Sequence, residues 1–201
     1  MSILTDMKRF KQKECTRQAV LKAARETIAR RGFSATTARE VAEAAGVAVG
    51  TVFAHFPTMG RLAETLLDET VGEALARAGE GGPPEGDWVG QLLHVSAALY
   101  EAYAAQPELS RQVLSGSLFE AAPDGPSRRR MDAFAAWVGA RVEAAVAAGH
   151  MEPIHPQDAF AAFFAFYFGA LVLGLRGELD TAGQLQLLGR LLRRTFRPVP
   201  P

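Results

Sequence analysis

The sequence predicts an all-α fold of about nine helices, in which a small three-helix bundle is followed by a larger helical domain. Ala, Leu, Glu and Arg are abundant, and no run of β-branched residues alternates with period two. Apolar residues instead recur at helical spacing between breaks rich in Gly and Pro. Hydrophobic residues make up 48% of the 201 residues and charged residues 22%, which is typical of a folded globular chain.

The first helix is expected over residues 11–31. Val20, Leu21, Ala24 and Ile28 form one apolar stripe along it, and Gly32 follows as a stop signal. The stripe predicts that this helix packs against the elements that follow it.

Two short helices are expected next, over residues 38–45 and 48–54. Thr37 and Glu40 have the spacing of a capping box, and Gly46 supplies the left-handed conformation of a tight turn between the helices. Such a pair, spanning about residues 37–56, has helix-turn-helix geometry, with the second helix free to enter a DNA groove. An αα-hairpin with no role in DNA binding has the same pattern.

The remaining helices are longer. Thr58 is placed to cap a helix that runs to about residue 78 and belongs to both domains. We expect a DNA-binding domain at 1–58 and a larger domain at 59–201. The other expected helices lie at 88–105, 107–120, 127–148, 157–176 and 182–197.

Charge is unevenly distributed although the net charge is zero. Residues 1–60 carry ten Lys and Arg against five Asp and Glu, and residues 61–201 carry twelve against seventeen. A basic front on an acidic body is expected where one end meets a polyanion, although clustering on a solvated helix gives the same counts.

Residues 159–175 contain no charged side chain. Seventeen residues are at the short limit for crossing a bilayer, which takes about 20, and the chain has one such run. A helix that is apolar on all sides is more often buried between partners, so we expect a buried helix and no membrane.

The front of the chain resembles the DNA-binding domain of TetR-family repressors. The resemblance covers about residues 17–67 continuously and rests on Gly32-Phe33, Thr36-Thr37, Ala45-Gly46-Val47, Gly50-Thr51 and His55-Phe56-Pro57, among others. The rear of the chain resembles the family in layout. The resemblance implies a ligand-responsive regulator, most simply a repressor, that binds a palindromic DNA operator as a homodimer. An activator or a ligand-independent regulator of the same fold is the alternative; an enzyme or carrier with an incidental helix pair is a more distant one.

Candidate DNA-binding residues lie in the helix pair and in a basic N-terminal arm. Small side chains let the second short helix approach a groove floor, and the hydroxyl and cationic groups suit bases or phosphates. The candidates are Thr36, Thr37, Arg39, Ala48, Val49, Gly50, Thr51, Phe53, His55, Lys11, Lys13 and Arg17.

Two positions depart from the family pattern. Phe53 stands where the family commonly has Tyr, and Met59 stands where it commonly has Lys. Both changes remove a phosphate contact, for which the basic arm could compensate; alternatively, Met59 packs beneath the helix pair.

The resemblance also implies a small-molecule site in the rear domain, where aromatic residues suit an apolar or aromatic effector. Each is also a candidate for ordinary core packing. The ligand-binding candidates are Trp88, Tyr100, Tyr103, Phe119, Phe134, Trp137, Phe164 and Tyr167.

The charge-free helix is expected to pair with the last helix across a dimer axis as a four-helix bundle. Its aromatic arc is too wide for one chain's neighbouring helices to cover. The interface candidates are Phe160, Phe163, Phe168, Leu171, Leu175, Leu185, Leu188 and Leu192.

Other signals are weak. His150, Glu152 and His155 lie in a Pro-containing stretch without a fourth ligand, so we expect a loop and no metal. Cys15 has no second cysteine to pair with, which suits a reducing, cytoplasmic compartment. No catalytic motif and no cofactor motif is evident, so no enzymatic activity and no cofactor are expected.

Overall fold

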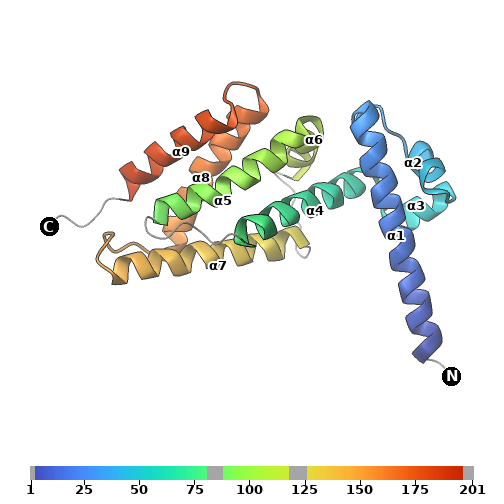
Figure 1. The fold of residues 1–201 in the computed structure, drawn as a ribbon, viewed down its shortest axis with the longest axis horizontal. Coiled ribbons are helices and arrows are strands. Elements are labelled where there is room, and N and C mark those ends of the chain that lie inside the picture. Colours follow the sequence, from blue (N-terminus) through green and yellow to red (C-terminus); the bar gives the residue numbers. More distant parts are fainter. Residues whose placement is uncertain (1–2, 81–87, 118–125, 197–201) are drawn as a thin grey trace. The chain divides into compact units, whose positions relative to one another are not determined.

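The computed structural model describes residues 3–80, 88–117 and 126–196, which contain nine α-helices and no strand (Figure 1). The all-α prediction is confirmed. The helices are α1 (Ile3–Arg31), α2 (Ala38–Ala45), α3 (Val49–His55), α4 (Met59–Glu80), α5 (Trp88–Ala105), α6 (Pro107–Ser117), α7 (Pro126–Ala147), α8 (Pro156–Leu175) and α9 (Thr181–Thr195).

The first helix is longer than its apolar stripe predicts. α1 begins at Ile3, eight residues before the expected start at residue 11. Side chains from Asp6 to Cys15 are exposed, among them Met7 at 52% and Phe10 at 72%. Because the side chains from Asp6 onward are exposed here, no hydrophobic periodicity marks this part of the helix in the sequence.

The chain divides into two compact units. Unit 1 comprises Met1–Glu69 and Glu108–Ser115, and unit 2 comprises Thr70–Pro107 and Gly116–Pro201. Two helices, α4 and α6, contribute residues to both units. The expected boundary at residue 58 therefore leaves the start of α4 and most of α6 out of the front unit.

Unit 1 is organised around a single apolar cluster. The predicted stripe of α1 is fully buried there, and Val41 and Val52 bring α2 and α3 onto it. Burial of such side chains contributes about 1.5–3 kcal/mol each, which fixes the short helices that could not be stable alone. The members are Val20, Leu21, Ala24, Ile28, Val41, Ala42, Val52, Phe56, Leu62, Ala63, Leu66 and Leu109.

Unit 2 packs α5 against α7, α8 and α9. The Tyr100 hydroxyl on α5 donates to the carbonyl of Tyr167 on α8 at 3.0 Å, and the two rings stack at 5.1 Å. Between α8 and α9, the buried Gln184 amide donates to the Ala170 carbonyl at 2.9 Å. These bonds satisfy polar groups inside an otherwise apolar interior.

Candidate nucleic-acid interface

The turn between α2 and α3 has the geometry that the sequence predicts. The Thr37 hydroxyl caps α2 by accepting the main-chain N–H of Glu40. In return, the Glu40 carboxylate accepts the main-chain N–H of Thr37 at 2.9 Å. Gly46 has a φ of 67°, and the Val47 N–H closes the turn on the Ala42 carbonyl at 2.9 Å. The capping box is confirmed, and α2 and α3 form a helix-turn-helix pair.

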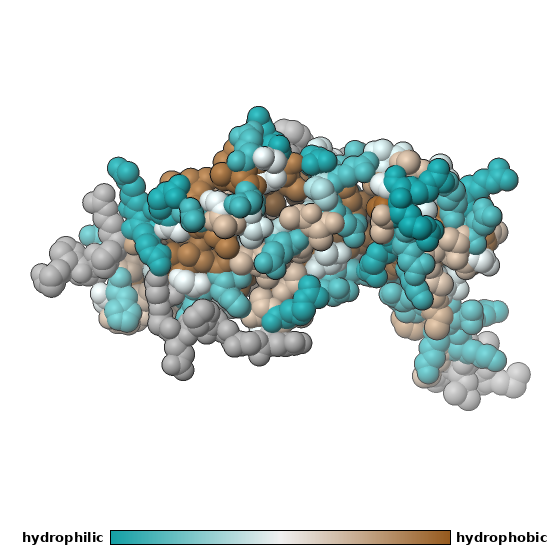
Figure 2. All heavy atoms as spheres, turned by 45° about the horizontal axis from the view of Figure 1, so that its top comes forward, coloured by the Kyte–Doolittle hydropathy of each residue, from teal (hydrophilic) through white to brown (hydrophobic). Residues whose placement is uncertain are grey.

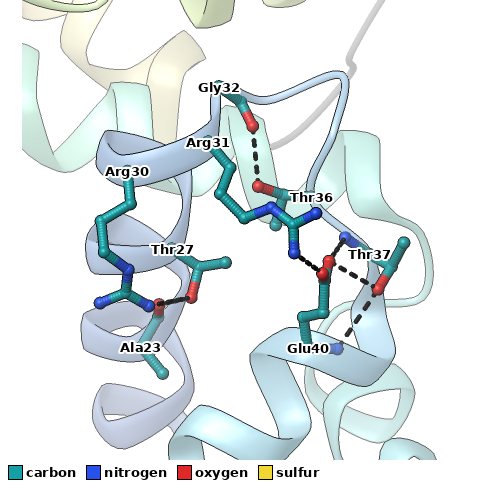
Figure 3. A network of polar contacts seen from close by, with 8 residues as sticks. All are labelled: Ala23, Thr27, Arg30, Arg31, Gly32, Thr36, Thr37 and Glu40. Carbon is teal, nitrogen blue, oxygen red and sulfur yellow. Dashed lines mark hydrogen bonds and ion pairs between the residues drawn. The ribbon is translucent and has the colours of Figure 1, made fainter.

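A polar network fastens α2 to the end of α1 (Figure 3). Arg31 forms an ion pair with Glu40, the same carboxylate that closes the capping box. Hydrogen bonds from the main chain and hydroxyl of Thr37 hold the pKa of Glu40 below its usual range. Sequence reasoning missed the role of Arg31, because nothing in a nine-residue separation across a turn marks a contact.

Thr36 has a different place from the one predicted. Its side chain is 7% exposed, and its hydroxyl donates to the Gly32 carbonyl at 2.8 Å (Figure 3). This hydroxyl holds the turn after α1 and faces inward, so we withdraw Thr36 as a phosphate contact. Thr37 remains exposed at the edge of the pair.

The outer face of α3 is open. Ala48, Val49, Gly50 and Phe53 are exposed, with Thr51 half-buried beside them. A Cβ atom at Gly50 would meet no atom within 4 Å. The buried Val52 holds the opposite face on the apolar cluster, so α3 presents small side chains on a rigid support.

The cationic candidates fall into two groups. Lys11, Lys13 and Arg39 are exposed, and within the described residues none of them forms an ion pair. Arg17 instead lies over the Phe56 ring at 5.1 Å and approaches the Glu69 carboxylate at 3.9 Å. Arg17 thus also has a structural role, and its contact with phosphate stays a prediction.

Glu69 was not a candidate in the sequence, yet it joins α4 to α1. Besides Arg17, its carboxylate accepts from Arg25 at 3.0 Å. One carboxylate between two guanidinium groups fixes the middle of α4 beside the middle of α1. In the sequence, only the apolar stripe of α1 indicated that another helix packs beside it.

Met59 begins α4 and packs partly buried against the apolar cluster of unit 1. This finding favours the second of the two readings open from the sequence. His55 is half-buried, its ring 6.3 Å from that of Phe56. Both residues border the pair rather than project from it.

Five of the eight aromatic candidates, Tyr100, Phe134, Trp137, Phe164 and Tyr167, belong to a continuous set of ring contacts that also includes Phe163. Phe134 contacts Trp137 at 5.9 Å and Phe163 at 5.6 Å; Phe163 then contacts Tyr167, which stacks on Tyr100. Burial raises the pKa of Tyr103 to about 12. Phe164 contacts Tyr167 at 6.3 Å.

Two aromatic candidates stand apart from this set. Trp88 packs edge-on against Phe196 at 4.8 Å. Phe119 lies outside the described residues.

Several interface candidates are occupied within the chain. Phe163, Leu171, Leu188 and Leu192 are at most 2% exposed, and Leu175 is 9% exposed. They belong to the interior of unit 2, so they cannot be the surface that meets a partner. Phe160, Phe168 and Leu185 are half-buried and remain available for that contact.

His155 caps the start of α8. Nδ1 of His155 accepts the N–H of Gln157 at 3.3 Å, ahead of Pro156 in the first turn. Within the described ranges no three His, Cys, Asp or Glu side chains are grouped to hold a metal ion.

Comparison with known proteins agrees with this geometry. Residues 20–66 match the sequence profile described as "Bacterial regulatory proteins, tetR family". The chain is 34% identical over 86 residues to the uncharacterized HTH-type transcriptional regulator YvkB of Bacillus subtilis (strain 168). That alignment covers 43% of this chain and 44% of the relative, so the chain matches less than half of the relative's length.

Solved structures extend the likeness to the whole fold. A proposed TetR-family transcriptional regulator from Rhodococcus sp. superposes with a TM-score of 0.63 at 25% identity, covering 88% of this chain and 96% of that one. The TetR transcriptional regulator from Nitrosomonas europaea ATCC 19718 gives 0.62 at 19% identity, covering 89% and 96%. The chain therefore shares its overall fold with these structures, and over residues 20–66 its sequence matches the TetR family of bacterial regulatory proteins.

Proposed function

We propose that this protein is a cytoplasmic, ligand-responsive repressor that binds a palindromic operator as a homodimer. In this proposal residues 1–58 bind DNA, and residues 59–201 bind the effector and the second subunit. The single observation that carries the proposal is the open, small-residue face of α3, held rigid by Val52 in a helix-turn-helix pair. The match of residues 20–66 to the TetR family of bacterial regulatory proteins supports the same proposal.

DNA binding follows from what α3 presents. Val49 and Gly50 leave room for the helix to approach base edges, and the Thr51 hydroxyl can donate to or accept from them. Lys11, Lys13 and Arg39 are positioned on the exposed surface of the same unit and would neutralise phosphates. Base contacts then set the sequence, and phosphate contacts set the register.

Dimerisation follows from α8. Within the described residues α8 is the one helix long and apolar enough to span a bilayer, with a mean hydropathy of 1.8, yet only 28% of that window is buried. Hydrophobic residues gather on the side of unit 2 where α8 and α9 lie (Figure 2). We assign this surface to a second copy of the chain; it comprises Phe160, Phe164, Phe168, Val172 and Leu185.

An isologous contact of α8 and α9 would make a four-helix bundle. Two recognition helices would then lie about 34–36 Å apart to enter successive major grooves. A small molecule bound in unit 2 would favour a spacing that does not fit, and its effect is limited to its differential affinity, typically about 1–3 kcal/mol. The aromatic residues of α5, α7 and α8 favour an apolar or aromatic effector.

The proposal is tested by titrating labelled DNA from upstream of the gene against a scrambled duplex of equal composition at two salt concentrations. We expect tighter binding to the upstream duplex and a steep fall in affinity with salt. Equal affinity for both duplexes would contradict the proposal that the protein is a sequence-specific regulator.

A further inference from the structure

The guanidinium of Arg141, on α7 in unit 2, forms no ion pair with a carboxylate among the described residues. Its guanidinium carbon lies 3.6 Å from the centre of the Trp137 ring, which is the spacing of a stacked pair. Nε donates to Gln91 Oε1 at 2.9 Å, and Nη1 donates to the Trp137 carbonyl at 3.3 Å. Both acceptors are neutral, so no ion pair compensates this charge within the described residues.

The side chain is also partly withdrawn from water. Arg141 and Trp137 are half-buried, and desolvation lowers the pKa of Arg141. Arg128 on the same helix shows the usual arrangement: it is exposed, and its Nε donates to the Asp132 carboxylate at 3.0 Å. The two arginines differ in that only Arg141 is desolvated, stacked and held in one orientation without an anion.

The geometry of the fork indicates what would complete it. A guanidinium has five N–H groups, and two of those on Arg141 are used by Gln91 and Trp137. Three remain on the terminal nitrogens, an arrangement that matches the two oxygens of a carboxylate. The stack and the two hydrogen bonds fix the plane beforehand, so little side-chain freedom would be lost on binding.

The residues around Arg141 indicate what kind of group could be attached to a bound carboxylate. Trp137 continues into Phe134, which contacts Phe160 at 6.3 Å and Phe163 at 5.6 Å. An anion held at Arg141 therefore has the half-buried ring of Phe134 beside it on α7 for an apolar body.

We propose that Arg141, Trp137 and Gln91 recognise the carboxylate of an effector that has an apolar or aromatic body. This inference rests on the proposed function, in which unit 2 binds a small molecule. Arg141 supplies the charge, Trp137 orients it, and Gln91 is a positioning residue that sets the plane of the guanidinium.

Calorimetric titration of the full chain tests the inference with two acids, 4-phenylbutyrate and octanoate, each compared with its primary amide. We expect at least one acid to bind saturably, once per chain, and about tenfold or more tighter than its amide, because the amide cannot form the ion pair. Because the chain has two Trp residues, the Trp88→Phe protein leaves Trp137 as the reporter. Its fluorescence should change with the same midpoint.

The variants are matched. Arg141→Gln should abolish the preference for acid over amide, and Arg141→Lys, which keeps the charge and loses the fork, should weaken acid binding by a smaller factor. Arg128→Gln, on the same helix, should bind as the wild type does. Thermal melting of each variant shows whether it folds. If Arg141→Gln does not fold, Arg141→Lys still tests the proposal through its weaker binding of the acid.

Three results would overturn the inference: no saturable binding of either acid, equal binding of acid and amide, or an unchanged preference in Arg141→Gln. Sedimentation of Arg141→Gln as a monomer would also overturn it, since the guanidinium would then serve a subunit contact. Specific DNA binding is measured separately. If the wild-type protein does not bind DNA specifically, the proposed function is contradicted. If it binds DNA specifically but binds neither acid, only this inference is contradicted.

Discussion

The Glu108 carboxylate on α6 accepts the main-chain N–H of Ser34, 74 residues earlier in the chain, at 2.9 Å. The same carboxylate fills the space beside Gly32, where a Cβ atom would meet Oε2 of Glu108. Gly32 has a φ of 81°, a left-handed conformation that glycine adopts without strain. Glu108 thereby connects α6 to the turn that leads into the helix-turn-helix pair.

This contact predicts a pH-dependent stability. Hydrogen bonds from Ser34 lower the pKa of Glu108 below its ordinary value of 4.5. A carboxyl whose folded pKa is depressed contributes stability above its unfolded pKa, and this contribution is lost as the pH falls through the folded pKa. The Glu108→Gln protein should therefore melt below the wild type at pH 7, and the difference should shrink near pH 3. The same difference in melting temperature at both pH values would show that the carboxylate charge is irrelevant.

The Thr37 cap predicts a local loss of stability. Thr37→Ala removes the acceptor for the Glu40 N–H and should cost about 1 kcal/mol, measured by urea denaturation. Thr65→Ala is the control, because that hydroxyl lies inside α4 and donates only to the Arg61 carbonyl of its own helix. A loss in Thr65→Ala as large as that in Thr37→Ala would contradict the capping explanation.

The exposed lysines near the start of α1 predict a change in salt dependence. Replacing Lys11 and Lys13 by Gln should reduce the slope of log affinity against log salt by up to about 0.9 for each lost phosphate contact. The fall should be similar for specific and scrambled duplexes, since phosphate carries no base information. Lys22→Gln provides an exposed control on the same helix. If Lys22→Gln alone lowers the slope, the assignment of Lys11 and Lys13 as phosphate contacts is wrong.

The exposed edge of α8 predicts a separable effect on dimerisation. Val172 is 36% exposed, so Val172→Arg should keep the helix content and melting behaviour while weakening the dimer about tenfold or more in sedimentation. The adjacent Leu171 is 2% exposed, so Leu171→Arg should unfold unit 2 instead. A stable Val172→Arg dimer of wild-type affinity would place the interface elsewhere.

Sequence reasoning predicted most of the fold because its signals are local. The Thr37–Glu40 box, the turn at Gly46 and the stripe from Val20 to Ile28 each lie within one or two helical turns, and each is found as expected. The range of α5 coincides with its prediction for the same reason. The largest difference in a helix boundary is at the start of α1, where the residues from Asp6 to Cys15 are exposed and impose no hydrophobic period.

The candidate site was predicted less completely because side-chain roles depend on distant partners. Thr36 and Arg17 look like phosphate contacts in the sequence, but Gly32 and Glu69 engage them. Leu188 and Leu192 have the spacing of an interface stripe, but both side chains face the interior of unit 2 and are buried there. Periodicity tells which residues share a face; it does not tell whether a neighbouring helix or a second chain covers it.

The most direct test of the central claim places a carboxylate on the open face of α3. A Cβ atom would meet no atom within 4 Å at Gly50, and the same holds at Gly79 on α4. We therefore expect Gly50→Glu and Gly79→Glu both to fold and melt like the wild type. With operator DNA at one fixed salt concentration, the account predicts that Gly50→Glu loses specific binding and that Gly79→Glu retains it. A folded Gly50→Glu protein that binds the operator with wild-type affinity would contradict the assignment of α3 as the DNA-reading helix.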